Sequence, residues 1–484
     1  MRPVTSNQAI VVYMEYMNMS SDETTSRSTF NTRGVPNVLG ISDTIDTADA
    51  VDTFDPIAYL NEPRWRSSRL GLERIESLMA ALGNPQDKLT VVHVAGTNGK
   101  GSTCAMVASV LQHAGYRTGL FTSPYIIEFT DRIRIDGQNV SLAALCAATQ
   151  TVRRVAEQMD DHPTEFELMT AVAFVCFVAA GCTMAVVEVG LGGRLDSTNV
   201  IAAPAVCALA PISFDHTDIL GSTLAQIAHE KAGIIKPGAA IVSALQRPEA
   251  MRVIENAALQ VGSPVTVVDE QRLSGTPAHF SYRSYTDLSI PLKGSYQTHN
   301  AALAIEAIDA LIQKGITITE QDLREGLAQV SWPGRFQVVS HSPEFIVDGG
   351  HNPQGAQALV DSLEANYPAR RTVLLIGVLA DKDVTSMLRR VLPSGCGVVC
   401  ITPPNPRALG AQELASQVVS LAKQLQNESI AIDERLLNPV CAPSIGQGVT
   451  CAQQMAGAEG LVCAFGSLYS IADIMAALDK HSAD

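Results

Sequence analysis

The segment Val91–Thr103 (VVHVAGTNGKGST) constrains the fold of this chain more than any other stretch. A run of β-branched apolar residues ends at Gly96, and after a polar turn the apolar stretch Cys104–His113 has the character of a helix. Glycines in such a turn let backbone N–H groups converge on an anion, the helix N-terminus adds partial positive charge, and Lys100 adds a full charge. The segment predicts a strand, a phosphate-binding turn and a helix, although the glycine spacing departs from the commonest phosphate-loop pattern. The alternative is a glycine-containing turn with an incidental lysine.

Strand-like and helix-like segments alternate along most of the chain, which is typical of a parallel sheet covered on both faces. Further strands are predicted at 117–121, 184–189, 205–212 and 239–242, with helices at 70–82, 142–159, 166–180, 300–314 and 319–329. Residues 332–335 (Trp-Pro-Gly-Arg) should break regular structure. Strands are predicted after this break at 345–347, 372–377, 397–401 and 460–465, while 430–450 has a loop-like composition.

The length of 484 residues exceeds what one core usually holds, so two domains are expected. We predict an α/β fold in which an N-terminal P-loop domain with a parallel-rich sheet precedes a smaller, Rossmann-like C-terminal domain. The boundary should lie near residues 333–342. Residues 1–50 are rich in polar residues toward their end and are predicted to form a disordered extension.

The composition excludes several classes of partner. A net charge of −15 argues against nucleic-acid binding, which requires a basic surface. No uninterrupted apolar stretch is long enough for a membrane span. The ten cysteines form no CxxC pair and lie in apolar contexts, which favours reduced thiols in a cytoplasmic protein.

Two polar residues follow predicted strands closely. Glu188 ends one strand before a glycine-rich turn, and His216 lies in a polar segment after the next. Because ligands of open α/β sheets bind beyond the carboxyl ends of the strands, both residues could hold a metal beside the phosphates. A glutamate oxygen suits Mg²⁺ better than a histidine nitrogen does. The alternatives are that Glu188 caps a loop or pairs with Arg194, and that His216 is a hydrogen-bonded loop residue.

Three further positions have both a functional and an ordinary interpretation. Lys231 lies in an apolar setting that could lower its pKa and let the neutral amine form a carbamate, or it is an exposed lysine paired with Glu230. The segment 348–353 (DGGHNP) could contact ribose or substrate, or it is a helix-initiating turn. Arg335 could reach nucleotide phosphates, or it is a solvated linker charge.

Seven motifs occur in an order that is specific as a set: GTNGKGS, FTSP, EVGLGGRLDSTN, DHTDILG, EKAGI, WPGRFQ and DGGHNP. The chain closely resembles folylpolyglutamate synthase/dihydrofolate synthase, a branch of the Mur ligase superfamily, from about Leu70 to Ser467. The resemblance implies an ATP-binding domain at 51–335 and a glutamate-ligase domain at 342–484. Tyr125 stands where many members have histidine, a departure that concerns pterin specificity.

The resemblance also implies roles for individual residues. Lys100, Lys231 and His351 would be catalytic, with Lys231 carboxylated. ATP would be bound by Gly96, Thr97, Asn98, Gly99, Lys100, Gly101, Ser102, Asn300, Arg335 and Asp348. The metal ligands would be Ser123, Glu188 and His216, and the substrates would be held by Arg132, Phe166, Glu167, Leu195 and Ser467. Within these sets, Arg132, His351 and Ser467 resemble positions near the incoming glutamate, and Phe166 and Glu167 resemble positions near the pterin.

The implied reaction joins L-glutamate to the carboxylate of a reduced folate or of dihydropteroate through an acyl phosphate, with release of ADP and phosphate. The expected cofactors are two Mg²⁺ ions, with a monovalent cation such as K⁺ as a further candidate. The expected enzyme is a monomer. The alternatives are another Mur-type amino-acid ligase and a P-loop switch protein that binds ATP without ligating anything.

Overall fold

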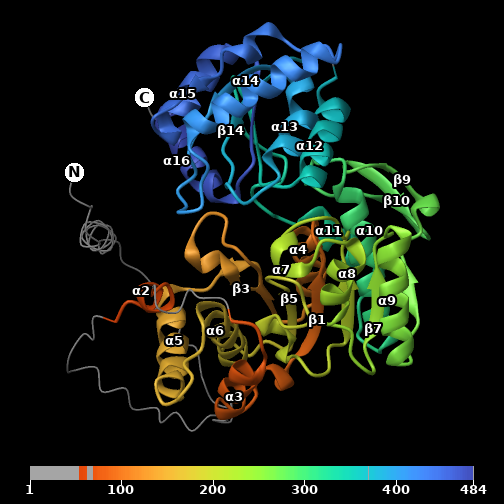
Figure 1. Ribbon diagram of the computed structural model, residues 1–484. Coiled ribbons are helices and arrows are strands. Elements are labelled where there is room, and N and C mark those ends of the chain that lie inside the picture. The colour runs from red at the N-terminus through yellow and green to blue at the C-terminus, as the bar shows by residue number, and fades with distance from the viewer. Residues whose placement is uncertain (1–53, 63–68, 369, 483–484) are drawn as a thin grey trace, which may run out of the picture. The chain divides into compact units, whose positions relative to one another are not determined.

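The computed structural model describes residues 54–62, 69–368 and 370–482 (Figure 1). The extension predicted at residues 1–50 lies outside these ranges. The described residues of Phe54–Asp484 belong to one unit, which contains an eight-stranded, a three-stranded and a six-stranded sheet. The predicted α/β class is confirmed by this architecture.

The eight-stranded sheet carries the phosphate-binding turn. Its strand order is β4-β3-β2-β5-β1-β6-β7-β8, and all pairings from β2 to β8 are parallel. The strands are β1 (Thr90–Ala95), β2 (Thr118–Phe121), β3 (Ile133–Ile135), β4 (Gln138–Asn139), β5 (Met184–Glu188), β6 (Val206–Leu209), β7 (Ala240–Ser243) and β8 (Val265–Val267). The central β1 pairs with β5 and β6 in a register that brings Ala95, Glu188 and Leu209 to one edge. The carboxyl ends of these three strands therefore meet where the turn begins.

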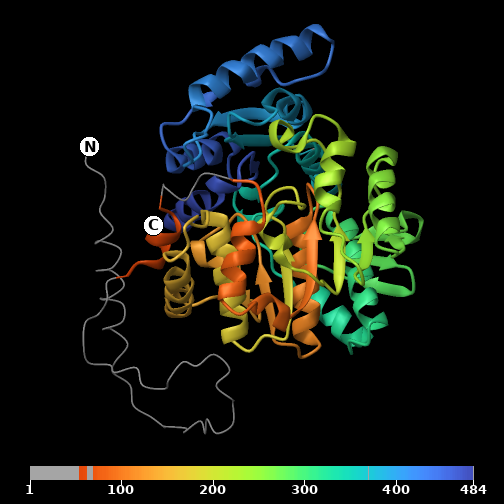
Figure 2. The same ribbon diagram turned by 60° about the horizontal axis from the view of Figure 1, so that its bottom comes forward.

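Helices cover both faces of this sheet (Figure 2). On one face lie α4 (Lys100–His113), α10 (Gln297–Gln313) and α11 (Glu320–Ala328). On the other lie α2 (Pro56–Leu60), α3 (Glu73–Ala81), α5 (Leu142–Ala156) and α6 (Glu165–Ala179). Near β6 and β7 the chain forms α7 (Thr217–Leu220), α8 (Leu224–Ala232) and α9 (Pro248–Gln260).

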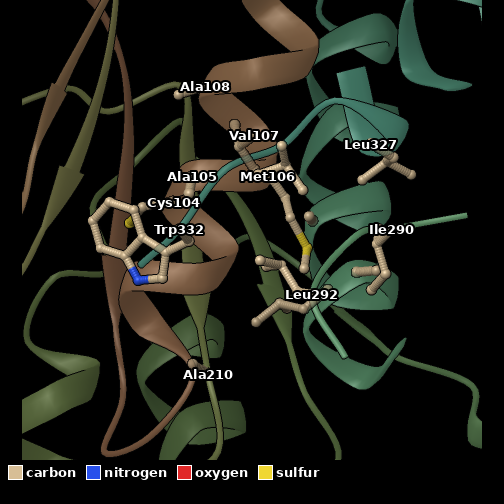
Figure 3. Close-up of a cluster of buried hydrophobic side chains, with 14 of the residues drawn as sticks. Cys104, Ala105, Met106, Val107, Ala108, Ala210, Ile290, Leu292, Leu327 and Trp332 are labelled. Carbon is tan, nitrogen blue, oxygen red and sulfur yellow. The ribbon is translucent and has the colours of Figure 1, made fainter. Parts of the chain in front are cut away.

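The helix after the turn is buried on nearly all sides. Its residues from Gly101 to Leu111 are buried, and Figure 3 shows Met106 and Val107 gathered with Leu292 and Leu327. A Cβ atom at Gly101 would lie 2.9 Å from the ring of Trp332, so this position has room only for glycine. The first lobe comprises the described residues up to Gly334. The Trp-Pro-Gly segment at its end thus packs directly on the first turn of α4.

The three-stranded antiparallel sheet was not predicted from the sequence. It consists of β9 (Leu273–Thr276), β10 (His279–Tyr282) and β11 (Tyr285–Leu288). Two tyrosine hydroxyls attach it to α10: that of Tyr282 donates to Glu306, and that of Tyr285 donates to Asp309 at 2.7 Å.

The six-stranded sheet forms the second lobe, with the order β12-β13-β17-β14-β15-β16 and β12 as its antiparallel edge. Its strands are β12 (Gln337–His341), β13 (Glu344–Asp348), β14 (Thr372–Ile376), β15 (Gly395–Cys400), β16 (Val440–Cys441) and β17 (Leu461–Phe465). Its helices are α12 (Pro353–Asn366), α13 (Val384–Val391), α14 (Ala411–Asn427), α15 (Ile445–Ala456) and α16 (Ile471–Ser482). Short 3-10 helices occupy Pro85–Lys88, Phe129–Arg132, Ser197–Val200, Glu270–Arg272, Leu392–Ser394, Glu434–Leu437 and Leu468–Ser470.

Two expectations about the second lobe were wrong in detail. Residues 337–341 fall inside the predicted linker but form β12, because they complete the edge of the second sheet. The loop-like segment 430–450 contains β16 and the start of α15. In the described part of the chain, no helix is both long and apolar enough to cross a membrane.

Candidate active site

The turn after β1 has the backbone geometry of an anion-binding loop. Gly96 and Gly99 have φ angles of +150° and +86°, a region that favours glycine. The N–H of Thr97 donates to the carbonyl of Pro211 at 2.8 Å, and its hydroxyl donates to the carbonyl of Ser213 at 3.1 Å. Gly99 is the N-cap of α4, and no side chain caps the helix. The first N–H groups of a buried helix are therefore available to an anion.

Lys100 and Glu188 form the charged centre beside this turn. The Nζ atom of Lys100 lies 3.7 Å from Oε1 of Glu188, and Oε2 accepts from the N–H of Ser123 at 3.3 Å. Burial raises the pKa of the Glu188 carboxyl, and the charge of Lys100 opposes that shift. Pairing of Glu188 with Arg194, an alternative left open by the sequence, is wrong, because Arg194 binds Glu230 at 2.9 Å.

Lys231 is buried directly beneath the turn. Its side chain donates to the carbonyl of Gly96 at 2.8 Å, and only 5% of the residue is exposed. Burial, with a contribution from the charge of Lys100, lowers the pKa of Lys231 to about 7. The interpretation as an exposed lysine paired with Glu230 is therefore wrong.

The pKa of Lys231 predicts a pH dependence of stability for the unmodified protein. The ordinary lysine pKa is 10.5, so between pH 7 and 10.5 the unfolded state binds more protons at this site than the native state. The free energy of unfolding should therefore increase over this range relative to a Lys231→Met variant. Denaturant titrations of both proteins in bicarbonate-free buffer would measure this, and parallel curves would contradict it.

Asp215 connects the two lobes. Its Oδ1 lies 2.7 Å from Nζ of Lys382, and its Oδ2 lies 3.4 Å from Nε2 of His351. Burial alone would raise the pKa of Asp215, but the hydrogen bond and charge of His351 and the charge of Lys382 hold it well below its usual range. His216 lies next to this cluster, 3.4 Å from Nζ of Lys382, and burial lowers its pKa to about 4. Sequence reasoning did not identify Lys382, although it follows the buried strand β14 closely.

Two residues predicted to contact the nucleotide, Asp348 on the second lobe and Asn300 on α10, make hydrogen bonds outside the Asp215 cluster. Asp348 accepts hydrogen bonds from the hydroxyl of Tyr296, from the N–H of Phe336 and from the N–H of Gly350, at 2.7 to 2.9 Å. Asn300 lies against Gly99 and donates to Gln297 at 2.9 Å. Asp348 thus fixes the linker beside Arg335, while Asn300 supports the turn. Tyr296 was not identified from the sequence.

Most predicted site residues line one cavity of about 400 Å³ between the lobes. They are Gly96, Thr97, Asn98, Gly99, Lys100, Gly101, Ser102, Ser123, Glu188, His216, Lys231, Asn300, Arg335, Asp348 and His351. A second cavity of about 430 Å³ shares Ser123, Pro124 and the turn 190–192 with the first. It contains three predicted substrate residues, Arg132, Phe166 and Leu195. The phosphate turn therefore lies next to a cavity that the ring of Phe166 lines.

Two predicted substrate residues line neither of these two cavities. Glu167 is buried, and its carboxylate accepts from the N–H of Thr164 in the capping box of α6. The carboxylate also pairs with Arg74 at 3.1 Å, so it already has partners within the protein. Ser467 is the N-cap of a 3-10 helix and accepts from the N–H of Tyr469. The guanidinium of Arg132 lies over the rings of Tyr125 and Phe129, 5.2 Å from each ring centroid. Arg132 lines the second cavity, whereas His351 lines the first.

The oxygen ligands at the turn suit a divalent cation. The Glu188 carboxylate and the Ser123 hydroxyl are hard donors of the kind that Mg²⁺ prefers, and the burial of Glu188 favours a cation close by. Among the described residues, no three His, Cys, Asp or Glu side chains are grouped to hold a metal. An ion here would therefore need further oxygen ligands, which the phosphates of a nucleotide could provide.

Two domain families match this chain. Residues 94–308 match the Mur ligase middle domain, and residues 334–468 match the glutamate ligase domain of the Mur ligases. The dihydrofolate synthase/folylpolyglutamate synthase of Bacillus subtilis is 36% identical over 439 residues, which cover 86% of this chain and 98% of that protein.

Solved structures agree with these matches. FolC of Escherichia coli in complex with DHPP and ADP has a TM-score of 0.78 and 32% identity, and the match covers 88% of this chain and 97% of that one. A bifunctional folylpolyglutamate synthase/dihydrofolate synthase with Mn, AMPPNP and L-glutamate bound has a TM-score of 0.76 and 30% identity, with 88% and 98% covered.

Proposed function

The chain belongs to the folylpolyglutamate synthase/dihydrofolate synthase family of Mur ligases, and we propose that it joins L-glutamate to folate-type carboxylates in its inter-lobe cavity. It is an ATP-dependent acid–amino-acid ligase. The observation that carries the proposal is the position of the phosphate turn, which shares one cavity with Glu188, Lys231 and His351 and adjoins a second cavity that contains Phe166.

The first step activates a poor electrophile. An oxygen of the acceptor carboxylate attacks the γ-phosphorus of ATP, the bond to the bridging oxygen breaks, and ADP leaves. The product is an acyl phosphate. Two anions must approach each other in this step, so the positive charge of Lys100 and the N–H groups at the start of α4 stabilise the charge that develops. Arg335 adds a second cation from the linker side of the same cavity.

The second step forms the amide. The neutral amino group of glutamate attacks the acyl carbon, the carbon–oxygen bond to phosphate breaks, and inorganic phosphate leaves with the electron pair. The nitrogen gives up one proton, which the departing phosphate accepts. His351 lines the cavity on the second-lobe side, and we assign it the role of orienting the glutamate. Asp215 and Lys382 join the lobes at 2.7 Å, and this contact should hold them together while the acyl phosphate reacts.

Ser123 and Glu188 are the residues that would hold a divalent ion, which would neutralise phosphate charge when bound. We propose Mg²⁺ as that ion, in two positions. His216 as a further ligand, a site for K⁺, the monomeric state and the cytoplasmic location stay predictions. The ten free cysteines, most of them buried, support the last of these.

A coupled assay of ADP release tests the function directly. Purified protein is given ATP and Mg²⁺, with and without L-glutamate, and either dihydropteroate or tetrahydrofolate as the acceptor. ADP release that requires both glutamate and an acceptor supports the ligase, and comparison of the two acceptors distinguishes the two activities. ADP release independent of glutamate would instead support the P-loop switch, and a requirement for another amino acid would support a different Mur-type ligase.

Phe166 is expected to determine the affinity for the acceptor. Its ring lines the second cavity and packs against Phe121, with the ring centroids 6.0 Å apart. Phe166→Ala should raise the KM for the acceptor about tenfold, because an aromatic face is lost. The KM values for ATP and glutamate should not change. Phe166→Leu is the matched control for lost volume, and an equal rise in all three KM values would contradict the assignment.

A further inference from the structure

The side chain of Asn98, at the tip of the phosphate turn, contacts the second lobe. Its Nδ2 donates to Oδ1 of Asn352 at 3.1 Å, and its Oδ1 accepts from Nδ2 of Asn352 at 3.0 Å. Nδ2 of Asn98 also donates to Oε1 of Gln354 at 2.7 Å. The two asparagines are 254 residues apart in the sequence and form a reciprocal amide pair between the lobes.

The surroundings of Asn352 fix the orientation of both amides. Oδ1 of Asn352 accepts from the N–H of Gly355, because this residue is the N-cap of α12, and its Nδ2 donates to Oδ2 of Asp215 at 3.2 Å. A flipped amide would direct its oxygen at the Asp215 carboxylate and its NH₂ at the N–H of Gly355. Asn352 is 2% exposed and uses both donor hydrogens and both acceptor sites.

This pair joins two parts of the reaction machinery. Asn98 lies between the glycines whose backbone surrounds the phosphates and two residues before Lys100. Asn352 directly follows His351, and Asp215, which Asn352 contacts, also binds Lys382 of the second lobe. A displacement of α12 relative to the turn would break the amide pair and remove both of its direct hydrogen bonds between the lobes. The amide pair therefore forms only when the second lobe is docked against the turn.

We propose that Asn98 and Asn352 form an inter-lobe latch, a pair of positioning residues through which nucleotide binding in the turn raises the affinity of the second lobe for glutamate. Asn98 then acts through Asn352 and not by contact between its side chain and the nucleotide. The inference rests on the proposed function, because it assumes that ATP binds at the turn and glutamate at the second lobe.

Binding measurements with a non-hydrolysable nucleotide test the latch. The Kd of L-glutamate is measured by calorimetry with and without AMP-PNP and Mg²⁺. In the wild type, the nucleotide should lower this Kd at least about fivefold. Asn98→Ala and Asn352→Ser should each abolish most of this effect, and in Asn352→Ser the Kd of the nucleotide alone should stay unchanged. Serine is a good N-cap, so the second variant keeps the start of α12.

Two further variants sharpen the test. Asn352→Asp keeps the cap acceptor and the shape but places an oxygen opposite Asp215, so it should weaken the coupling at least as much as Asn352→Ser. The double variant Asn98→Ala/Asn352→Ser should lose no more coupling than either single variant, because both remove the same interaction. Gln357→Ala is the matched control, since Gln357 is exposed on the same helix and donates to Asp361 one turn further along α12.

The outcomes separate the latch from the ligase. Unchanged coupling in the single variants, additive losses in the double variant, or a loss confined to nucleotide affinity would each overturn the latch. If the wild type does not release ADP in response to glutamate, the proposed function itself fails. If the wild type is an active ligase and the variants keep full coupling, only the latch is wrong.

Discussion

Lys100→Ala is expected to abolish glutamate-dependent ADP release, with a loss in kcat/KM of about 10²–10³ or more. Lys100 is the cation nearest to Glu188 at the start of α4, and its Nζ also donates to the carbonyl of Thr97 at 3.3 Å. No other lysine occupies the turn, so nothing in it replaces this charge when the phosphoryl group transfers. The assay described above measures the loss under saturating glutamate and acceptor.

The control for this variant is Lys88→Ala, which removes an exposed lysine before β1. Both variants should keep the wild-type circular dichroism spectrum and melting temperature, because Lys100 is partly exposed and contributes no core packing. A folded Lys100→Ala protein with near-normal turnover would contradict the assignment of the turn as the phosphate site.

Lys231→Ala is expected to have the second largest effect on turnover. The neutral amine of Lys231 can attack carbon dioxide, forming an N–C bond and releasing a proton, and this requires the depressed pKa that burial produces. The resulting carboxylate would add an oxygen ligand to the cavity that Glu188 also lines, where the described side chains alone offer too few for a metal. A loss of about 10²-fold or more in kcat is expected, the size seen when one catalytic group is removed.

Two observations distinguish a carboxylated lysine from a simple cation. Native mass spectrometry or electron density should show an added carboxylate at Lys231 in the wild type. Lys231→Arg keeps a positive charge but forms no carbamate, so it should be as inactive as Lys231→Ala. An unmodified lysine together with an active alanine or arginine variant would end the hypothesis.

The strands and helices around the phosphate turn could be predicted from the sequence because their apolar runs are long and periodic. The predicted strand at 184–189 corresponds to β5 (Met184–Glu188), and the predicted helix at 142–159 corresponds to α5 (Leu142–Ala156). The sheet β9–β11 was missed because its strands are short and partly exposed, and its stability depends on contacts with α10 that no local pattern records.

The residues of the candidate site were likewise predicted only in part from the sequence. Residues at strand ends, such as Glu188, were predicted because parallel strands bring their carboxyl ends together. Lys382 was missed because what marks it as a site residue is its contact with Asp215, which is 167 positions away in the sequence. The alternative of a helix-initiating turn at Asn352-Pro353 is confirmed by the N-cap of α12, and the same asparagine also contacts the phosphate turn. Sequence patterns do not show that one residue has both contacts.

A crystal structure with ADP and Mg²⁺ tests the central claim most directly, because that claim is the location of the phosphates. We predict that the β-phosphate lies within the turn formed by residues 96–102, in contact with Lys100 and the N–H groups at the start of α4, with the ion beside Ser123 and Glu188. An empty turn with the nucleotide bound elsewhere on the molecule would contradict the account.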